Sequence, residues 1–209
     1  EPTQSVQQEP ATSPTNTTTS VVLPAYNERN NIRPLVEEII EAVDIEALRP
    51  YEILIVDDGS TDGTREEIER MAAEIPELTA VLLSRNFGQS AALAAGIDNT
   101  TGEYVVTMDA DGQNDPMDIR ALVEQLDQGY DCVSGWRRNR QDPLSKRIPS
   151  NIQTYLAMRT GPNIHDFGCT LKAYNGDAVR EIDLYGEGHR YIPAKLHKRG
   201  YTVTEQEVN

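Results

Sequence analysis

The turn DADGQNDP, which begins at Asp109, combines three carboxylates with side-chain amides directly after the apolar run YVVTM. Because alternate residues of an extended segment share a face, Asp109, Asp111 and Gln113 can converge on one point. Their oxygen atoms are hard ligands that suit Mg²⁺ or Mn²⁺, with diphosphate oxygens and water completing the coordination. Asp115 and Pro116 suit instead the N-cap and the first residue of a helix. The pattern favours a metal site over its alternative, a solvated acidic turn.

A second acidic turn, VDDGSTDGT, follows another apolar run, YEILIV. Asp57 and Asp58 stand at the end of this run, where a carboxylate can accept hydrogen bonds from a nucleobase imide or a ribose hydroxyl. The alternative is a capped helix N-terminus, a role that suits residues 60–62 better than the two adjacent Asp residues.

A third turn, PAYNE, ends the run SVVLPAY. Pro24 and Tyr26 would shape the end of a strand there, and Glu28 adds a carboxylate. Pro and Asn are also ordinary turn residues, and Glu28 could simply favour the N-terminus of the next helix. This motif is weak when taken alone.

The three turns lie in a regular alternation of strand and helix patterns. Apolar, β-branched runs predict strands over residues 20–26, 51–58, 80–84, 103–109 and 130–136. Helical spacing of apolar residues predicts helices over residues 32–43, 65–75, 88–99 and 116–129. This order predicts an α/β fold with a Rossmann-like, mostly parallel sheet flanked by helices. Ligands bind such sheets at the carboxyl ends of the strands, which is where the turns fall, and the missing GxGxxG argues against a nicotinamide or flavin site.

The two ends of the chain differ from this central pattern. Residues 1–19 are rich in Pro, Thr and Gln and are predicted to be a disordered tail, followed by one domain over residues 20–209. Beyond Trp136 the pattern loosens, and we expect a helix over 148–159, a loop and strand over 165–179, a helix over 186–200 and a strand over 201–208. Because the sequence stops inside that last strand pattern, we expect a fragment of a longer protein.

Composition excludes some classes of function. Lys and Arg total 19 against 34 Asp and Glu, giving a formal charge of −15, which argues against nucleic acid as a partner. Cys132 and Cys169 lie in apolar segments without CxxC spacing, so we expect reduced core residues, as suits a cytosolic protein. No run approaches the roughly 18 to 20 apolar residues that a membrane span needs.

Taken together, PAYNE, VDDGSTDGT and DADGQNDP resemble, in order and spacing, the inverting family 2 glycosyltransferases of GT-A fold. HDFGCTLKAY and LYGEGHRYIPA are similar to the branch that transfers a hexose to a polyprenyl or dolichyl phosphate. The resemblance runs from about Ser20 to the C-terminus. One departure is Gly112, where many relatives carry Leu, which leaves the ligand positions intact but loosens the loop.

The resemblance implies how a nucleotide sugar would be bound. The nucleoside would be held by Pro24, Ala25, Tyr26, Glu28 and Asp58. Asp109 would lie beside the ribose and the metal, and Asp111, with Gln113, would ligate the Mg²⁺ or Mn²⁺ that neutralises the departing diphosphate.

The resemblance also assigns two later segments. Asp166 matches a position near the reacting carbon, where it would position the sugar or assist as a base; together with Asp111 it forms the predicted catalytic pair. His189 and Arg190 match residues that contact the diphosphate or the sugar. The alternatives are a turn capped by His165 and Asp166, and a surface helix carrying the other two.

A lipid-phosphate acceptor would already be anionic, so it would need cations more than a strong base. The dense basic stretch RRNRQDPLSKR is therefore the predicted acceptor site, with Arg137 and Arg147 as phosphate clamps and Lys146 beside them. A solvated loop is the alternative. The adjacent helix over 148–159 could lie against the membrane surface.

These observations lead to one main hypothesis: a metal-dependent inverting transferase that moves a hexose from a nucleotide sugar to a polyprenyl or dolichyl phosphate at the cytosolic membrane face. The resemblance favours UDP-glucose as donor, followed by GDP-mannose, and implies that membrane-spanning helices follow the domain. A transferase acting on a soluble glycan or polysaccharide, a non-catalytic nucleotide-sugar or metal-binding module, and a sugar-nucleotide pyrophosphorylase are the alternatives. The last would want a glycine-rich loop that PAYNERNN lacks.

Overall fold

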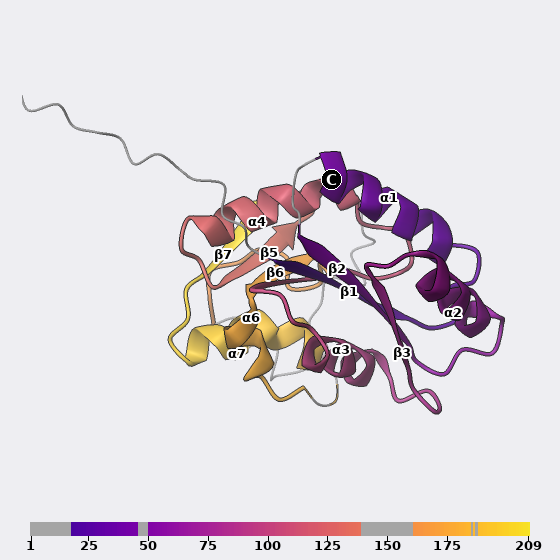
Figure 1. Ribbon diagram of the computed structural model, residues 1–209. Helices are drawn as coiled ribbons and strands as arrows, with labels where there is room; N and C mark the ends of the chain where they lie inside the picture. Colours follow the sequence, from indigo (N-terminus) through magenta and orange to yellow (C-terminus); the bar gives the residue numbers. More distant parts are fainter. Residues whose placement is uncertain (1–17, 46–49, 139–160, 185, 187) are drawn as a thin grey trace, which may run out of the picture.

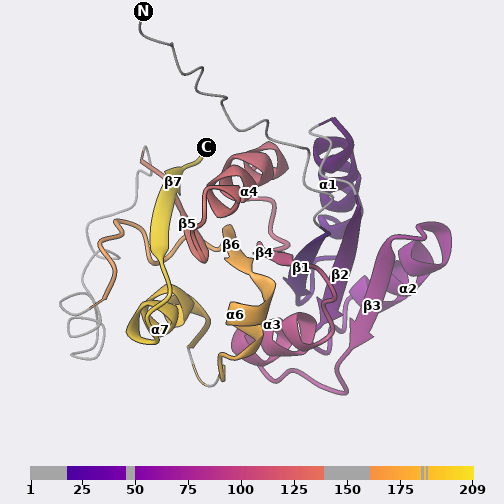
Figure 2. The ribbon, with the colours of Figure 1, turned by 60° about the vertical axis from the view of Figure 1, so that its left-hand side comes forward.

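A seven-stranded sheet runs through the part of the chain that the computed structural model describes, namely residues 18–45, 50–138, 161–184, 186 and 188–209 (Figure 1). The strand order is β3-β2-β1-β4-β6-β5-β7. The strands are β1 (Thr19–Ala25), β2 (Tyr51–Asp57), β3 (Leu78–Leu82), β4 (Tyr104–Thr107), β5 (Cys132–Trp136), β6 (Lys172–Asn175) and β7 (Val203–Glu207). Strands β3 and β7 form the two edges, which Figure 2 shows on opposite sides of the molecule.

The sheet is mostly parallel, with one strand reversed. Strands β3, β2, β1 and β4 run parallel to one another, and β5 pairs parallel with β7. Strand β6 lies between β4 and β5 and is antiparallel to both. The predicted α/β class and the Rossmann-like sheet are therefore confirmed, while the place of β6 is a feature that the strand pattern alone did not define.

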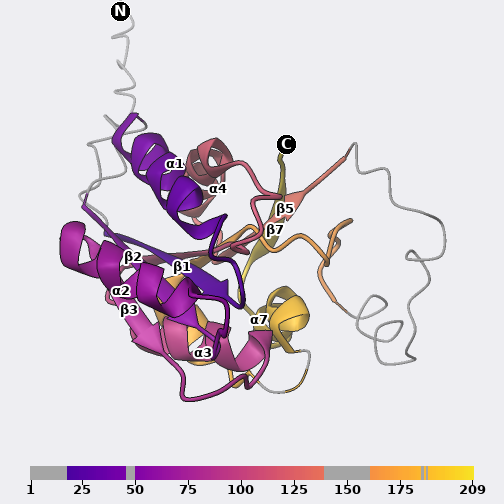
Figure 3. The same ribbon diagram turned by 90° about the vertical axis from the view of Figure 1, so that its right-hand side faces the viewer.

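Helices cover both faces of the sheet. They are α1 (Ile32–Ile45), α2 (Thr64–Glu74), α3 (Gln89–Asp98), α4 (Ile119–Asp127), α6 (Gly176–Arg180) and α7 (Ile192–Lys198), with 3₁₀ turns η1 (Pro116–Asp118) and η3 (Gly188–Tyr191). In Figure 3, α1 and α4 lie above the sheet and α3 and α7 lie below it. Each layer has its own buried cluster: α1, α2 and α4 pack on one face, and α3, α6 and α7 on the other.

Apolar periodicity explains these layers. In α4 the residues Ile119, Leu122, Val123 and Leu126 are buried, a spacing that places them on one helix face. The central strands β1 and β2 are buried on both faces, as expected for parallel strands covered by helices on each side. The turns at the strand ends are thus the polar segments that this scaffold holds in place.

Several element boundaries differ from those predicted. Strand β1 already begins at Thr19, inside the predicted tail, where Thr19 pairs with Tyr51. The predicted helix over 186–200 is a 3₁₀ turn followed by the shorter α7. Residues 1–17 of the predicted tail and the predicted helix over 148–159 lie outside the described residues.

Two further expectations concern cysteines and membrane spans. Cys132 and Cys169 are both buried and free, as expected for core thiols. Among the helices that the structure describes, α1 is the longest with 14 residues, and none combines the length and apolar character of a membrane span.

Candidate functional site

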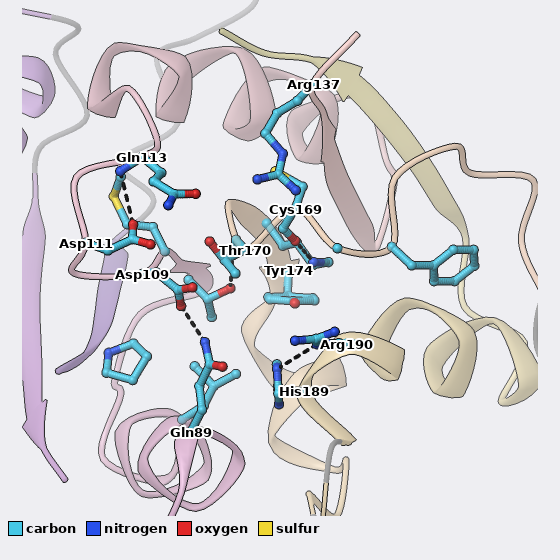
Figure 4. A pocket seen from close by; sticks show the side chains of 17 residues that line it. Gln89, Asp109, Asp111, Gln113, Arg137, Cys169, Thr170, Tyr174, His189 and Arg190 are labelled. Atoms are coloured by element: carbon cyan, nitrogen blue, oxygen red, sulfur yellow. Dashed lines mark hydrogen bonds between the residues drawn. The ribbon is translucent and has the colours of Figure 1, made fainter. Parts of the chain in front are cut away.

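Two adjoining cavities open at the carboxyl ends of the parallel strands. The first, here called the β1–β2 cavity, is lined by Pro24, Ala25, Tyr26, Glu28, Asp58, Asn86, Gly88, Gln89, Ala92, Asp109, Ala110 and Asp111. The second, the β4–β6 cavity, extends from β4 towards β6 and η3 (Figure 4). Four residues line both cavities: Pro24, Gln89, Asp109 and Asp111. The two cavities therefore form one continuous site with the DADGQNDP turn at their boundary.

The two adjacent Asp residues after β2 have different roles. Asp57 is fully buried and accepts hydrogen bonds from Arg65 Nε (2.8 Å) and from the Ser60 N–H (3.1 Å), so it fixes the turn. Asp58 lines the β1–β2 cavity, and its two carboxylate oxygens accept the N–H groups of Phe87 (2.7 Å) and Gly88 (2.9 Å). Asp58 thereby holds the loop before α3 at the edge of the cavity.

The loop after β1 is fastened to the loop after β2. Asn27 adopts a left-handed conformation with φ 59°, which Asn tolerates better than most residues. Its N–H donates to Ser60 Oγ and its Oδ1 accepts from the Thr61 N–H, both at 2.9 Å. This pairing fixes the neighbouring Tyr26, whose side chain is 47% exposed at the mouth of the cavity.

Glu28 combines both roles that its sequence position allows. It lines the β1–β2 cavity, and its carboxylate accepts a hydrogen bond from Asn31 Nδ2 at 2.7 Å. Its backbone carbonyl accepts the N–H groups of Asn31 and Ile32, both at 2.9 Å, where α1 begins. The residue therefore organises the helix start while it faces the cavity.

The acidic turn after β4 contains two groups of residues, one that begins a helical turn and one that lines the cavities. Asp115 accepts the Met117 N–H at 2.9 Å as the N-cap of η1, and Pro116 is the first residue of that turn. Asp109 and Asp111 both line the cavities, and Gln113 lines the β4–β6 cavity beside them. In Figure 4 these three side chains surround one region of the cavity.

Asp109 lies in an unusual electrostatic environment. Burial raises the pKa of its carboxyl to about 6, and the negative charge of Asp111 adds to this effect. A hydrogen bond from Gln89 Nε2 at 2.6 Å, the charge of Lys172 and a hydrogen bond with Thr170 oppose the rise. Two carboxylates that repel each other in a partly buried site are suited to share a cation.

The described residues fit a metal ion that a substrate helps to coordinate. They contain no group of three or more His, Cys, Asp and Glu side chains arranged to hold an ion by themselves. The predicted set has two carboxylates and one amide, Asp109, Asp111 and Gln113, and divalent ions of the Mg²⁺ type are commonly held by one or two carboxylates and substrate phosphates.

Asp166 is paired with Arg137. Arg137 Nε donates to Asp166 Oδ2 at 3.0 Å and Nη2 donates to Oδ1 at 3.4 Å, and both side chains are largely buried, with 13% and 16% exposed. Burial acts to raise the pKa of the Asp166 carboxyl, but the hydrogen bonds and charge of Arg137 outweigh it and hold that pKa below its usual value. Asp166 is therefore a stable anion at neutral pH.

His189 and Arg190 line the β4–β6 cavity from η3. His189 Nδ1 lies 2.7 Å from Ser90 Oγ on α3, and Arg190 Nε donates to His189 Nε2 at 3.4 Å. Because Nε2 accepts, we assign the ring hydrogen to Nδ1, which donates to Ser90. The pair thus belongs to the cavity wall, and the alternative of a surface helix pair does not hold for His189, which is 8% exposed.

The structure does not bring all predicted site residues together. The cavities are lined by the predicted nucleoside and metal residues and by Arg137, His189 and Arg190. Asp166 lines neither cavity, but it is hydrogen-bonded to Arg137, which lines the β4–β6 cavity. Lys146 and Arg147 lie outside the described residues, so their predicted role in binding phosphate is untested.

The cavity residues that sequence reasoning missed include Gln89, Lys172 and Tyr174. Gln89 is the first residue of α3, after the loop that follows β3, so its place at the carboxyl edge of the sheet could have been inferred. Lys172 is a charge inside the apolar strand pattern CTLKAY, which is the usual signal of a buried functional group. Tyr174 carries no such signal.

A mostly parallel sheet that holds two aspartates at its carboxyl edge, beside a divided cavity, defines a GT-A glycosyltransferase domain. The chain belongs to glycosyl transferase family 2, whose profile matches residues 20–183. The resemblance seen in the sequence is thereby confirmed.

Similar proteins extend this assignment. The chain is 44% identical over 179 residues to dodecaprenyl-phosphate galacturonate synthase of Rhizobium johnstonii, covering 84% of this chain and 53% of that protein. It is 42% identical over 177 residues to undecaprenyl-phosphate 4-deoxy-4-formamido-L-arabinose transferase of Edwardsiella ictaluri, covering 83% and 54%. The chain thus spans about half the length of these curated relatives.

Solved structures share the fold. A mannosyltransferase of Pyrobaculum calidifontis, solved with GDP-mannose and Mn²⁺, superposes with a TM-score of 0.68 at 24% identity, covering 90% of this chain and 54% of that one. Glucosyl-3-phosphoglycerate synthase of Mycobacterium tuberculosis, solved with Mn²⁺, UDP and phosphoglyceric acid, gives 0.71 at 22%, covering 91% and 68%. At this identity the likeness supports the fold alone.

Proposed function

We propose that this chain is the catalytic part of a metal-dependent inverting glycosyltransferase that moves a sugar from a nucleotide sugar to a polyprenyl phosphate. The observation that carries the proposal is the position of the predicted donor residues. All six residues assigned to the nucleotide sugar, Pro24, Ala25, Tyr26, Glu28, Asp58 and Asp109, line the β1–β2 cavity. The curated relatives named for transfer to dodecaprenyl and undecaprenyl phosphate support the acceptor class.

The donor would lie across both cavities. Tyr26 and Asp58 would contact the nucleoside in the β1–β2 cavity, where Asp58 is held between the two loops that form the wall. Asp109 and Asp111, at the boundary of the cavities, would face the diphosphate. Since two carboxylates repel a diphosphate, this arrangement needs a cation between them.

Asp109, Asp111 and Gln113 would hold that cation, Mg²⁺ or Mn²⁺. The bound ion would neutralise the charge that builds on the departing nucleoside diphosphate. Gln89 would keep the Asp109 carboxylate oriented through its hydrogen bond at 2.6 Å. Asp111, which accepts only the Gln113 N–H (3.0 Å) among the described residues, would be available to bind.

The acceptor would supply its own nucleophile. A phosphate oxygen would attack the anomeric carbon as the bond from that carbon to the diphosphate oxygen breaks, so the configuration inverts and the nucleoside diphosphate leaves. No proton has to be removed from an anionic phosphate. Asp166 would then act by position and charge, because its pairing with Arg137 keeps it ionised and weakly basic. Arg137, together with Lys146 and Arg147, would attract the phosphate.

The proposal also concerns the identity of the transferred sugar. The sequence favours glucose from UDP-glucose, followed by mannose from GDP-mannose, and the relatives add a uronate and a formamido-arabinose to the candidates. The reaction would take place at the cytosolic face of the membrane, where a lipid phosphate meets nucleotide sugars.

The test is a transfer assay with the purified chain. Radiolabelled UDP-glucose, UDP-galacturonate and GDP-mannose are incubated with Mn²⁺ or Mg²⁺ and a short-chain polyprenyl phosphate in detergent. We expect a labelled product that partitions into organic solvent, requires the metal ion and is lost with EDTA. Label that instead appears on an added soluble glycan would favour the polysaccharide-type alternative. Absence of product from every donor, with either metal ion, would refute the lipid-phosphate acceptor.

A further inference from the structure

The division of the site into two cavities has a consequence for the sugar. Of the six residues predicted to bind the nucleotide sugar, only Pro24 and Asp109 also line the β4–β6 cavity. If the nucleoside occupies the β1–β2 cavity and the diphosphate lies at Asp109 and Asp111, the sugar extends into the β4–β6 cavity. This step rests on the proposed function.

Two side chains of β6 line the β4–β6 cavity without any assigned role. Lys172 and Tyr174 are two residues apart on one strand, so they project from the same face of the sheet. Thr107 of β4, which pairs with Lys172 in register, lines the same cavity. Lys172 is 3% exposed and Tyr174 is 0% exposed. We call Lys172 and Tyr174 the β6 floor.

The Nζ group of Lys172 has N–H donors that form no hydrogen bond within the described residues. Among the described residues its Nζ makes one hydrogen bond, to the carbonyl of Cys169. An ammonium group carries three N–H donors and a neutral amine carries two, so in either state at least one remains for a ligand. Burial lowers the pKa of Lys172, and neighbouring negative charges that include Asp166 and Asp109 oppose this effect without being hydrogen-bonded to Nζ. A buried ammonium with open donors is costly unless a ligand completes it.

Tyr174 is the clearer case, because its hydroxyl is the only buried side-chain polar atom without a hydrogen-bond partner in the described part of the chain. Burial raises the pKa of Tyr174 well above its usual value, and the Thr107 hydroxyl, which is near enough to act as a hydrogen-bond partner, opposes the rise. Thr107 Oγ1 donates to the Thr170 carbonyl at 3.2 Å, however, and forms no hydrogen bond of acceptable geometry with the phenol. Tyr174 is thus a protonated donor that faces the cavity without an acceptor.

Such an unpaired donor costs stability. Leaving a buried polar group without a hydrogen-bond partner destabilises the fold, so such a group is expected where a ligand supplies the missing partner. Figure 4 shows Tyr174 between Thr170 and Arg190, at the centre of the cavity. The ligand that completes the floor must therefore present several acceptor oxygens.

We infer that Lys172 and Tyr174 form the floor of the subsite for the transferred sugar and donate hydrogen bonds to its oxygen atoms. A sugar is rich in such acceptors, and a carboxylate on the sugar would gain more from Lys172 than a hydroxyl. The two residues are therefore positioned to discriminate between sugars attached to the same nucleotide. Phosphate oxygens share this chemistry, so the test compares ligands with and without the sugar.

The test measures binding by calorimetry in the presence of Mn²⁺. Tyr174→Phe and Lys172→Met are compared with the wild-type chain for the tightest binder among UDP-glucose, UDP-galacturonate and GDP-mannose, and for the matching nucleoside diphosphate. We expect Tyr174→Phe to weaken the nucleotide sugar about five- to tenfold, the effect of one hydrogen bond, and Lys172→Met to weaken it about tenfold or more. Affinity for the nucleoside diphosphate should stay within about twofold.

Thermal unfolding of the free protein supplies a second readout. Tyr174→Phe removes an unpaired hydroxyl, so the midpoint should stay the same or rise, whereas a structural hydrogen bond would make it fall. Tyr201→Phe, whose hydroxyl bonds Glu181 at the surface (3.2 Å), and Lys198→Met on an exposed position of α7 are the matched controls. Neither control should change donor affinity.

The outcomes separate this inference from the proposed function. A nucleotide sugar that binds the wild-type chain and both variants equally would contradict the sugar subsite but not the proposed function. Equal weakening of the nucleoside diphosphate would show that the floor contacts phosphate, and a lowered midpoint for Tyr174→Phe would show a structural role; both overturn the inference. If the wild-type chain binds none of the donors, both the proposed function and the sugar subsite are contradicted.

Discussion

Asp109 and Asp111 lie two residues apart in one turn but in different surroundings. Asp109 is partly buried and accepts a hydrogen bond from Gln89, whereas Asp111 is exposed and accepts only a backbone N–H among the described residues. The carboxylate with fewer protein partners is the better candidate for binding an ion, and its exposure makes it dispensable for folding. Asp111 is therefore the residue through which the metal hypothesis can be tested most cleanly.

We predict that Asp111→Ala abolishes the metal-dependent part of donor binding. The variant should bind the nucleotide sugar at least about tenfold more weakly in Mn²⁺, with little difference in EDTA, because only the ion-mediated contact is lost. Calorimetric titration with and without EDTA measures this, and the melting temperature should not change. Asp98→Ala, at an exposed end of α3, is the control. A variant that keeps both its affinity and its metal dependence would contradict the ligand assignment.

The Arg137–Asp166 pair makes a prediction about pH. Because the folded-state pKa of Asp166 is held below its ordinary value by Arg137, aided by Lys172, the pair stabilises the fold fully above the unfolded pKa of about 4. That contribution is lost as the pH falls through the lower, folded pKa. Arg137→Met should therefore reduce the free energy of unfolding at pH 7 and flatten its decline towards acid.

Urea unfolding between pH 7 and pH 3 measures this effect. Arg138→Met is the matched control, because Arg138 pairs with Glu207 at 3.5 Å in an exposed position with side-chain exposures of 63% and 49%. Exposed pairs contribute about 0–1 kcal/mol, so the control should follow the wild type. Parallel pH profiles for wild type and Arg137→Met would show that the pair does not stabilise the fold.

The residue scale also shows what the sequence could predict. The acidic turns after β2 and β4 were identified as site residues, and both line the cavities. Successive side chains of a strand point to opposite faces, so only one of Asp57 and Asp58 could face the site. Which one does so depends on Arg65, a partner eight residues away that binds Asp57, and no local pattern specifies that choice.

At the scale of elements, the turn after β2 is held by a close backbone approach. Gly59 has φ +72°, and a Cβ built there would lie 2.3 Å from the carbonyl carbon of Arg85, in the loop whose Asn86 lines the β1–β2 cavity. Gly112 has nearly the same φ, +71°, but a Cβ there would meet no atom within 4 Å. The two glycines separate the cost of the conformation from the cost of a clash.

We predict that Gly59→Ala destabilises the fold by about 3 kcal/mol or more, since it adds a backbone clash to the strain of a left-handed residue. Gly112→Ala should cost about 1 kcal/mol, the strain alone. Urea unfolding of both variants measures the difference. Equal losses would mean that the Arg85 loop moves away without cost.

Helices and strands were predicted well where the apolar pattern is regular and poorly where it is not. Each of the first five predicted strands overlaps an observed strand, because central parallel strands are continuous apolar runs. The insertion of β6 between β4 and β5 is a long-range pairing without a local signal. Since that pairing determines which side of β6 faces the cavity, Tyr174 could not be identified from the sequence, whereas Lys172 had a local signal, its charge inside an apolar strand pattern.

At the scale of the whole molecule, charge is the dominant feature. A formal charge of −15 creates self-repulsion that opposes the compact state, and salt screens it. Helix α1 shows the effect locally: Glu37, Glu38 and Glu41 are exposed, and Glu37 and Glu41 are one turn apart, where like charges repel. None of the three side-chain carboxylates has a hydrogen bond or ion pair within the described residues.

We predict that the wild-type chain becomes more stable as KCl rises from about 0.05 M to about 0.5 M, the range in which screening of exposed charges is completed. Replacing Glu37, Glu38 and Glu41 by Gln removes three of the fifteen excess negative charges. This variant should be more stable than the wild type by about 0.5–1 kcal/mol at low salt, and the gap should close at high salt. Urea unfolding at each salt concentration measures both effects.

Two results would contradict this prediction. A stability difference that persists at high salt would mean that Gln stabilises α1 through helix propensity rather than through charge. A wild-type stability that does not rise with salt would show that repulsion is balanced by ion pairs such as Arg33–Glu67.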